Sequence, residues 1–156
     1  MTEKLDDSDR RILTVLQRDG SLSVEAVADA VNLSRNACWR RIRRLEQDGV
    51  IRARVALVDA EKAGLGLSVF VFIRTSSHEA DWLAAFRKAV TALPEITGVY
   101  RTSGDLDYVL RARVADVRHY DRLYQRLIKL VPLNDVSASF VMEDIKETTA
   151  IPLDIL

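Results

Sequence analysis

The chain has 156 residues, and its 23 basic and 23 acidic side chains give a formal net charge of zero. A hydrophobic content of 48% and a charged content of 29% exclude a disordered protein and indicate a globular one. No apolar run approaches the ~20 residues that a membrane span needs, and no signal peptide opens the chain. A single cysteine cannot form an internal disulfide. We therefore expect a cytoplasmic protein of one domain or two small ones, with no membrane partner.

The first fifty residues predict three helices. Asp6 begins the capping segment of the first helix, Ser23 caps the second, and Ser34 caps the third. Asn32, in the turn before Ser34, is the residue that tolerates a left-handed conformation. The inner faces of the first two helices are predicted to carry Ile12, Leu13 and Leu16, and then Ala26, Val27, Ala30 and Val31. Two helices, a short turn and a third helix form the order of a helix-turn-helix motif.

The third helix is predicted to have an apolar back and a cationic front, and to end before Gly49. Cys38, Ile42 and Leu45 recur at helical spacing, so we expect them to be buried and Cys38 to have a packing role. Arginine neutralises phosphate and pairs with guanine, while asparagine and glutamine pair with adenine. The helix is therefore predicted to lie in a DNA major groove, with a candidate DNA-binding set of Ser34, Arg35, Asn36, Trp39, Arg40, Arg43, Arg44 and Gln47.

The charge distribution decides between DNA binding and a merely solvated arginine face, which is the common alternative for such a helix. Residues 35–54 contain seven arginines against Glu46 and Asp48, whereas residues 59–156 have slightly more acidic than basic side chains. Positive charge is therefore concentrated around the third helix, as in a DNA-binding protein. Trp39 has two open roles, at the edge of the DNA or packed against the first helix, and packing is favoured.

Residues 50–57 alternate apolar and basic side chains, which predicts a strand that is either a wing or a connection to the next domain. Its Arg52 and Arg54 are candidates for phosphate contact, although exposed strand arginines often have no specific role. Gly64 and Gly66 indicate a hinge over residues 59–66. We therefore divide the chain into a DNA-binding domain (1–58), the hinge (59–66) and a second domain (67–156).

The second domain is predicted to contain strands at 67–74, 96–103, 108–114 and 136–145, and helices capped by Ser77 and Asp116. The order strand–helix–strand–strand–helix–strand is the ferredoxin-like βαββαβ plan. The predicted fold is thus α+β, a winged or plain helix-turn-helix joined to a ferredoxin-like domain. One sheet face, carrying Phe70 or Val71 according to register, has no helices to cover it. We therefore expect a homodimer, which would also present two half-site readers to DNA.

The segment Gly104-Asp105-Leu106-Asp107-Tyr108 between two predicted strands has two open interpretations. Backbone amides of a glycine turn can hold a carboxylate, and Asp105 or Asp107 can meet an ammonium group, which together would bind a free amino acid. The alternative is an Asx-type hairpin turn stabilised by its own aspartates.

These motifs, in this order, resemble the Lrp/AsnC family of bacterial and archaeal transcription regulators over nearly all of the chain. Asp6–Leu13 is similar to the family's opening motif, Ser34 to Glu46 to its reading helix, and Ser103–Tyr108 to its SGDxDY loop. The resemblance implies a DNA-binding dimer, often assembled into tetramers or octamers, that responds to an amino acid. It favours the ligand role for the Gly104 loop and adds the preceding strand, so that the candidate effector-binding residues are Tyr100, Thr102, Ser103, Gly104, Asp105, Asp107 and Tyr108. Arg35 stands where the family often has proline, which leaves the recognised base sequence open.

Cys38-Trp39, residues 55–57 and 62–67, and residues 139–149 are most similar to the branch of the family that senses cysteine and controls its detoxification. Cysteine is therefore the first effector expected. A tetrapyrrole decarboxylase-like enzyme, with Asp105 and Asp107 as acid and base, is one alternative, and an effector-independent DNA-packaging protein is another. Neither His78 nor His119 has a Cys or His neighbour at ligand spacing, so no metal, cofactor or catalytic residue is expected.

Overall fold

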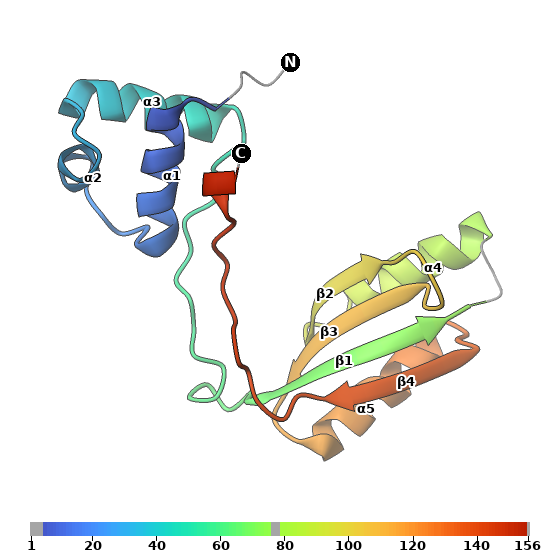
Figure 1. Cartoon of the computed structure of the whole chain (residues 1–156). Coiled ribbons are helices and arrows are strands. Elements are labelled where there is room, and N and C mark those ends of the chain that lie inside the picture. Colours follow the sequence, from blue (N-terminus) through green and yellow to red (C-terminus); the bar gives the residue numbers. More distant parts are fainter. Residues whose placement is uncertain (1–4, 76–78, 156) are drawn as a thin grey trace. The chain divides into compact units, whose positions relative to one another are not determined.

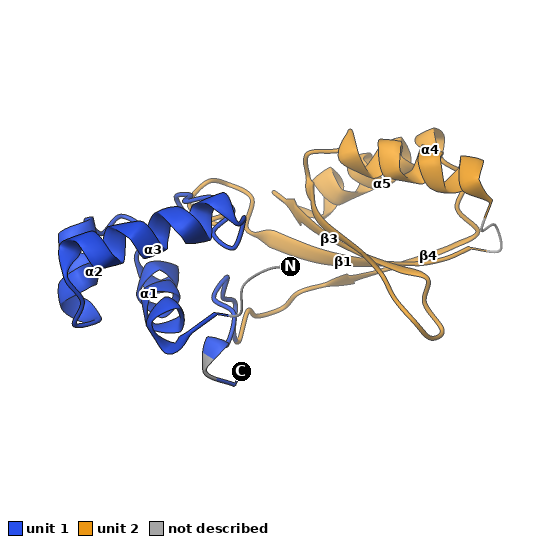
Figure 2. Ribbon diagram, turned by 90° about the horizontal axis from the view of Figure 1, so that it is seen from above, with its two compact units in different colours: residues 1–57, 146–156 blue, residues 58–145 orange. Residues whose placement is uncertain are grey.

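The computed structural model describes residues 5–75 and 79–155. The chain forms two compact units, one of residues 1–57 with 146–156 and one of residues 58–145 (Figure 2). Each unit has its own hydrophobic core. No helix in the described ranges is both long and apolar enough to cross a lipid bilayer.

The first unit contains α1 (Asp7–Arg18), α2 (Val24–Ala30) and α3 (Arg35–Gln47) (Figure 1). The predicted caps are confirmed. Asp6 forms a capping box with α1, the Ser23 hydroxyl accepts from the Ala26 amide at 3.1 Å, and Ser34 caps α3. Asn32 has a φ of 55°, and Gly49 after α3 has a φ of 72°. The left-handed residue expected in the turn before α3 is therefore Asn32, as predicted.

The core of this unit is formed by one face of each helix. The predicted inner face of α2 is partly wrong, because Ala28 is buried there and the predicted Ala30 is exposed. Val24, Val27, Ala28 and Val31 follow the spacing of a helical stripe better than the predicted set does. The buried residues of the core are Ile12, Leu13, Val27, Ala28, Val31, Cys38, Ile42, Leu45 and Leu153.

The last residue of that core belongs to the C-terminal tail. Leu153 lies in the short helix η1 (Leu153–Ile155) and is only 6% exposed. The tail is also bonded to α1, since the Ile151 amide donates to the Gln17 side-chain oxygen at 2.7 Å and the Gln17 amide donates back to the Ile151 carbonyl at 3.3 Å. Residues 146–156 therefore belong to the first unit, and their assignment to the second domain was wrong.

The strand predicted over residues 50–57 is not formed. Val55 and Leu57 are 75% and 73% exposed, and no described strand of the chain pairs with them. An alternating pattern alone does not make a strand, because its backbone groups need a neighbouring strand. The predicted hinge forms a turn in which the Asp59 carboxylate accepts from the Lys62 amide at 3.0 Å, and Gly64 has a φ of 80°.

The second unit contains β1 (Leu67–Arg74), α4 (Ala80–Thr91), β2 (Ile96–Arg101), β3 (Tyr108–Val114), α5 (Val117–Leu130) and β4 (Asp135–Phe140). The strands form an antiparallel sheet in the order β2-β3-β1-β4, and α4 and α5 cover one of its faces (Figure 2). The predicted ferredoxin-like plan is confirmed. β2 and β4 end earlier than predicted, at Arg101 and Phe140.

The register of β1 decides which side chains face the helices. Val71 lies opposite Leu110 and is buried among the helices, whereas Phe70 lies opposite Arg111 on the open face and is 36% exposed. Asp116 caps α5 as predicted, its carboxylate accepting from the His119 amide at 2.7 Å. Ser77, the predicted cap of α4, lies outside the described residues, and the helix itself begins at Ala80 with Glu79 as its N-cap.

Candidate nucleic-acid interface and effector loop

The orientation of α3 is set by its buried stripe. Cys38, Ile42 and Leu45 are at most 3% exposed, as the helical spacing predicted. Burial raises the pKa of the Cys38 thiol, which keeps the sulfur neutral and makes it a packing group rather than a redox centre. With this stripe against α1 and α2, the opposite side of α3 faces solvent. The predicted DNA-binding residues that lie exposed are Ser34, Arg35, Asn36, Trp39, Arg40, Arg43 and Gln47.

Arg44 is the exception, because a buried acid on α1 binds it. Its guanidinium contacts the Asp9 carboxylate, whose side chain is only 1% exposed. The same carboxylate accepts from Arg41 Nη1 at 2.9 Å, and Arg41 also bonds to Asp6 at 2.7 Å. Arg44 therefore joins α3 to α1, while its side chain stays 36% exposed, and its predicted contact with DNA stays a prediction.

Asp9 was missed by the sequence reasoning, although its spacing signals it. Ile12, Leu13 and Leu16 follow Asp9 by three, four and seven positions, so one face of α1 carries the acid together with these apolar residues. Hydrogen bonding from the Asp9 backbone, reinforced by Arg41, lowers the pKa of Asp6. Hydrogen bonds to Asp6 and then Asp9 raise the pKa of Arg41. The lowered pKa of Asp6 and the raised pKa of Arg41 favour the charged forms of this pair, which joins the two helices.

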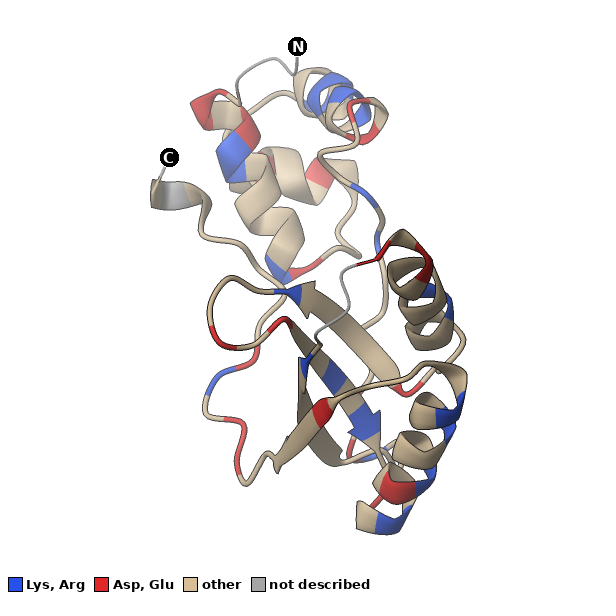
Figure 3. Ribbon diagram, turned by 90° about the vertical axis from the view of Figure 1, so that its right-hand side faces the viewer, with Lys and Arg blue, Asp and Glu red and all other residues tan. Residues whose placement is uncertain are grey.

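Arg40 and Arg43 lie at the surface of α3, as Arg35 does. Arg40 makes no hydrogen bond or ion pair with any residue that the structure describes. Arg43 lies 3.7 Å from the Glu46 carboxylate, and its guanidinium stands 5.9 Å from the centre of the Trp39 ring. Trp39 is 51% exposed, and both of its predicted roles, at the edge of the DNA and packed against the first helix, stay predictions. Figure 3 shows where the basic and acidic residues lie along the ribbon.

The remaining candidates on this unit are partly used inside it. The Ser34 hydroxyl accepts from the Ala37 amide at 3.3 Å as the helix cap. Arg35 pairs with Glu25 of α2 at the surface. Arg54 lies 3.3 Å from the Glu46 carboxylate and 3.5 Å from the Gly20 carbonyl, whereas Arg52 is exposed. These pairs are solvent-accessible, so they leave the side chains able to exchange partners.

The Gly104 loop is closed by its own hydrogen bonds. The Thr102 amide donates to the Asp107 carbonyl at 3.0 Å, and the Asp107 carboxylate accepts from the Thr75 amide at 2.8 Å. Gly104 has a φ of 123°, a conformation that a side chain would strain. Arg74 donates to the Asp105 backbone carbonyl at 2.9 Å, and Asp105 itself is exposed. Asp107 thus stabilises the turn, while Asp105 presents a carboxylate to solvent.

The candidate effector residues do not all lie together. Thr102, Ser103, Gly104 and Asp105 are exposed in the loop. Tyr100 lies opposite Val109 on the open face of the sheet and is 53% exposed. Tyr108 points to the other face, where it is 5% exposed and its ring centre lies 4.7 Å from that of Phe86. The structure therefore corrects the placement of Tyr108, which is a core residue of the helical face.

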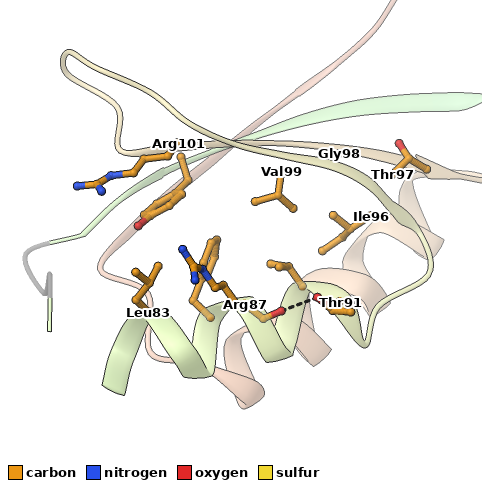
Figure 4. A pocket seen from close by; sticks show the side chains of 11 residues that line it. Leu83, Arg87, Thr91, Ile96, Thr97, Gly98, Val99 and Arg101 are labelled. Atoms are coloured by element: carbon orange, nitrogen blue, oxygen red, sulfur yellow. Dashed lines mark hydrogen bonds between the residues drawn. The ribbon is translucent and has the colours of Figure 1, made fainter. Parts of the chain in front are cut away.

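A cavity of about 510 Å³ lies between α4 and β2 (Figure 4). Of the candidate effector residues only Tyr108 lines it, so the sequence reasoning missed this site. A cavity depends on the spacing of two elements, for which the sequence carries no local signal. The lining residues are Leu83, Phe86, Arg87, Val90, Thr91, Ile96, Thr97, Gly98, Val99, Arg101 and Tyr108.

The histidines offer no metal site in the part of the chain that can be described. His119 Nε2 lies 3.2 Å from the Glu95 carboxylate, and its Nδ1 accepts from the Ala115 amide at 3.3 Å. His78 lies outside the described residues. Nowhere in residues 5–75 and 79–155 do three His, Cys, Asp or Glu side chains gather as metal ligands would.

Comparison with known families matches both parts of the chain. Residues 5–52 match the model described as "Winged helix-turn-helix DNA-binding", and residues 68–151 match the "Lrp/AsnC ligand binding domain". The first match covers all three helices of the DNA-binding unit. The second covers all of the sheet except Leu67, covers both of its helices and extends into the tail.

Curated relatives match over nearly their whole length. The DNA-binding transcriptional activator DecR of Escherichia coli (strain K12) is 48% identical over 151 residues, which cover 96% of this chain and 99% of DecR. The glutamate uptake regulatory protein of Zymomonas mobilis is 50% identical over 153 residues, which cover 98% of this chain and 93% of that protein. These relatives are transcription regulators, and the comparison favours that function over the enzyme alternative.

Solved structures share the fold. An AsnC family transcriptional regulator from Agrobacterium tumefaciens is 49% identical with a TM-score of 0.94, covering 97% of this chain and 99% of that one. A transcriptional regulator from Neisseria meningitidis, solved as a complex with L-Met, is 32% identical with a TM-score of 0.92 at the same coverage.

Proposed function

Because the chain belongs to the Lrp/AsnC family of DNA-binding transcriptional regulators, we propose that the exposed side of α3 reads operator DNA in the major groove. The observation that carries this proposal is the position of Arg40. Its side chain is exposed and has no bonding partner among the described residues, on the side of α3 opposite the buried Cys38 stripe. Arg43 stands one turn further along the same side. Asn36 and Gln47 place amide groups towards the two ends of that side, where they can pair with adenine.

The functional unit in this proposal is a homodimer formed through the open face of the sheet, with further assembly to tetramers or octamers. Four side chains without helical cover support it: Phe70, Phe72, Tyr100 and Val109. Phe70 and Tyr100 are exposed and Phe72 and Val109 are half-buried, and apolar surface of this kind on a sheet face favours a self-complementary contact. A twofold dimer would present two copies of α3 to half-sites spaced by a whole number of DNA turns.

We further infer that the effector is an amino acid held at the Gly104 loop, and that cysteine is the first candidate. Asp105 supports this because it is the exposed carboxylate of the loop and can meet an ammonium group. The L-Met complex of the Neisseria regulator supports the ligand class. Glutamate also belongs among the candidates, since the regulator named for glutamate uptake is as similar to this chain as DecR is.

DNA binding is tested by gel shift of the protein on its own promoter over a range of salt concentrations. A reader that contacts several phosphates loses affinity steeply as salt rises. A flat salt response would contradict the proposal. The bases of the recognised site then follow from footprinting of the same complex.

The effector is tested by a thermal-shift screen of the twenty amino acids on the full chain, followed by gel shift with each one that raises the melting temperature. We expect cysteine to act, Asp105→Ala to abolish the response while keeping DNA binding, and the control Asp121→Ala on α5 to keep both. If no amino acid changes melting or DNA binding, the effector-independent packaging function is the better description. If the response survives Asp105→Ala, the loop is only a turn.

A further inference from the structure

The cavity between α4 and β2 has apolar walls and two arginines at one end. Leu83, Phe86 and Val90 contribute apolar surface from α4, and Ile96 and Val99 contribute it from β2. Its volume of about 510 Å³ lies within the range of small-molecule sites, roughly 300 to 1,000 Å³. Figure 4 shows Ile96 and Thr91 towards one end of the cavity and Leu83 with the tips of Arg87 and Arg101 towards the other.

The cationic end is formed by two arginines that come from opposite walls. Arg87 rises from α4 and Arg101 extends from β2 (Figure 4). Neither guanidinium has an ion pair or hydrogen bond within the described ranges. Arginine prefers planar, bidentate carboxylates, and two unpaired guanidiniums at one rim favour binding of such a group.

A third donor stands at the same cavity. The Tyr108 ring is buried, yet its hydroxyl forms no hydrogen bond to any described residue, so the cavity is where it can find a partner. The other two hydroxyls are already used. Thr91 donates to the Arg87 carbonyl at 2.7 Å, and Thr97 is bonded to Arg111 in the neighbouring strand. The groups left for a ligand are therefore donors that suit an anion.

The lining contains no aspartate or glutamate. An amino acid bound here would leave its ammonium group beside two guanidiniums without a counter-charge, which is unfavourable. We propose that this cavity is a second small-molecule site, separate from the Gly104 loop, and that it binds a monocarboxylate with an apolar body and no amino group. The carboxylate lies between Arg87 and Arg101, and the hydrocarbon body lies along the apolar walls.

Three probes with one carbon skeleton test the ligand class on the full-length protein. These are 4-methylpentanoate, its amide, and leucine, each titrated by calorimetry and followed by NMR of the backbone amides. We expect the carboxylate to bind and the amide to bind about tenfold more weakly, because the charge-assisted hydrogen bonds are lost. Leucine should bind this cavity more weakly than 4-methylpentanoate. Equal binding of acid and amide, or no binding of the acid at millimolar concentration, overturns the proposal.

Three variants locate the site. Arg87→Gln and Arg101→Gln should each weaken 4-methylpentanoate binding about tenfold, whereas the matched surface change Arg122→Gln on α5 should leave it unchanged. Both lining arginines belong to solvent-accessible positions, so circular dichroism is expected to show folded variants. Asp105→Ala should not affect this binding. If Asp105→Ala removes binding while Arg87→Gln and Arg101→Gln do not, the acid binds the Gly104 loop and the second site does not exist.

Discussion

Asp9 on α1 and Arg41 on α3 are joined by a 2.9 Å hydrogen bond in which the carboxylate is buried and the guanidinium is partly exposed. The same carboxylate contacts Arg44, one helical turn further along α3. A buried carboxylate is unfavourable without such partners, and here two arginines of α3 provide them. The arginines that join α3 to α1 are thus Arg41 and Arg44, whereas the proposed function rests on Arg40 and Arg43.

Replacing Asp9 by Asn should destabilise the DNA-binding unit by about 3 kcal/mol, because two guanidiniums lose a buried counter-charge. The control Asp7→Asn removes an acid that is 90% exposed and pairs with Arg10, and should cost less than about 1 kcal/mol. Trp39 reports this unit alone in a Trp82→Phe background, since the chain has two tryptophans. Urea unfolding followed by Trp39 fluorescence measures both changes. Equal effects of the two substitutions would contradict the buried role of Asp9.

Arg40 and Arg41 are neighbours in the sequence, but only Arg41 pairs with described acidic residues. Replacing Arg40 should therefore affect DNA binding, and replacing Arg41 should affect stability. Arg40→Ala should weaken operator binding, reduce the slope of log affinity against log salt by about 0.9 if Arg40 contacts one phosphate, and leave stability unchanged. Arg41→Ala should lower the stability of the unit, since it removes a partner of Asp6 and Asp9. Gel shifts across salt and urea unfolding measure the pair. Wild-type DNA binding by Arg40→Ala would remove this residue from the interface.

The C-terminal tail is predicted to stabilise the helices that it covers. Leu153→Ala should cost about 2 to 4 kcal/mol in the free energy of unfolding of the first unit, because Leu153 is 6% exposed in that core. Ile155→Ala, two residues on and 79% exposed, should change it by less than about 0.5 kcal/mol. The Trp39 signal measures both. A similar small effect for both variants would mean that the tail does not contribute to the core.

Glu95 is predicted to make the stability of the second unit depend on pH. Burial raises the pKa of its carboxyl, but hydrogen bonds from its own backbone amide, Arg126 and His119 outweigh burial, so the pKa lies below the ordinary value. A lowered folded pKa contributes stability above the unfolded value of about 4.3, and that contribution is lost as the pH falls through the folded value. Glu95→Gln should therefore lower the urea midpoint at pH 7 and have less effect at pH 3. Trp82 fluorescence in a Trp39→Phe background measures this, and an equal difference at both pH values would contradict it.

The sequence predicted what is local in this fold. Ser34, the Cys38 stripe and Gly49 define α3 within one stretch of chain, and the structure confirms all three. The role of Arg44 depends on which face of α1 meets α3, which the spacing within α3 does not reveal. The strand predicted over residues 50–57 failed for a related reason, since the alternating pattern says nothing about a neighbour to pair with.

The features that escaped prediction depend on distant residues. The contact of Gln17 with Ile151 joins positions 134 apart, and the tail has no periodic pattern from which this contact could be predicted. Tyr108 was placed among the candidate effector-binding residues because it ends the segment that resembles the SGDxDY loop. Alternation along β3 instead turns its ring away from the loop and into the helical face, where it reaches the cavity.

The return of the tail to α1 means that the gene encodes the DNA-binding unit in two separated pieces. A chimaera that takes residues 1–57 from this regulator and the rest from a relative would set a foreign C-terminus against Gln17 and the Leu153 position. Exchange of operator specificity between such proteins should therefore succeed more often when residues 1–57 and residues 146–156 are exchanged together.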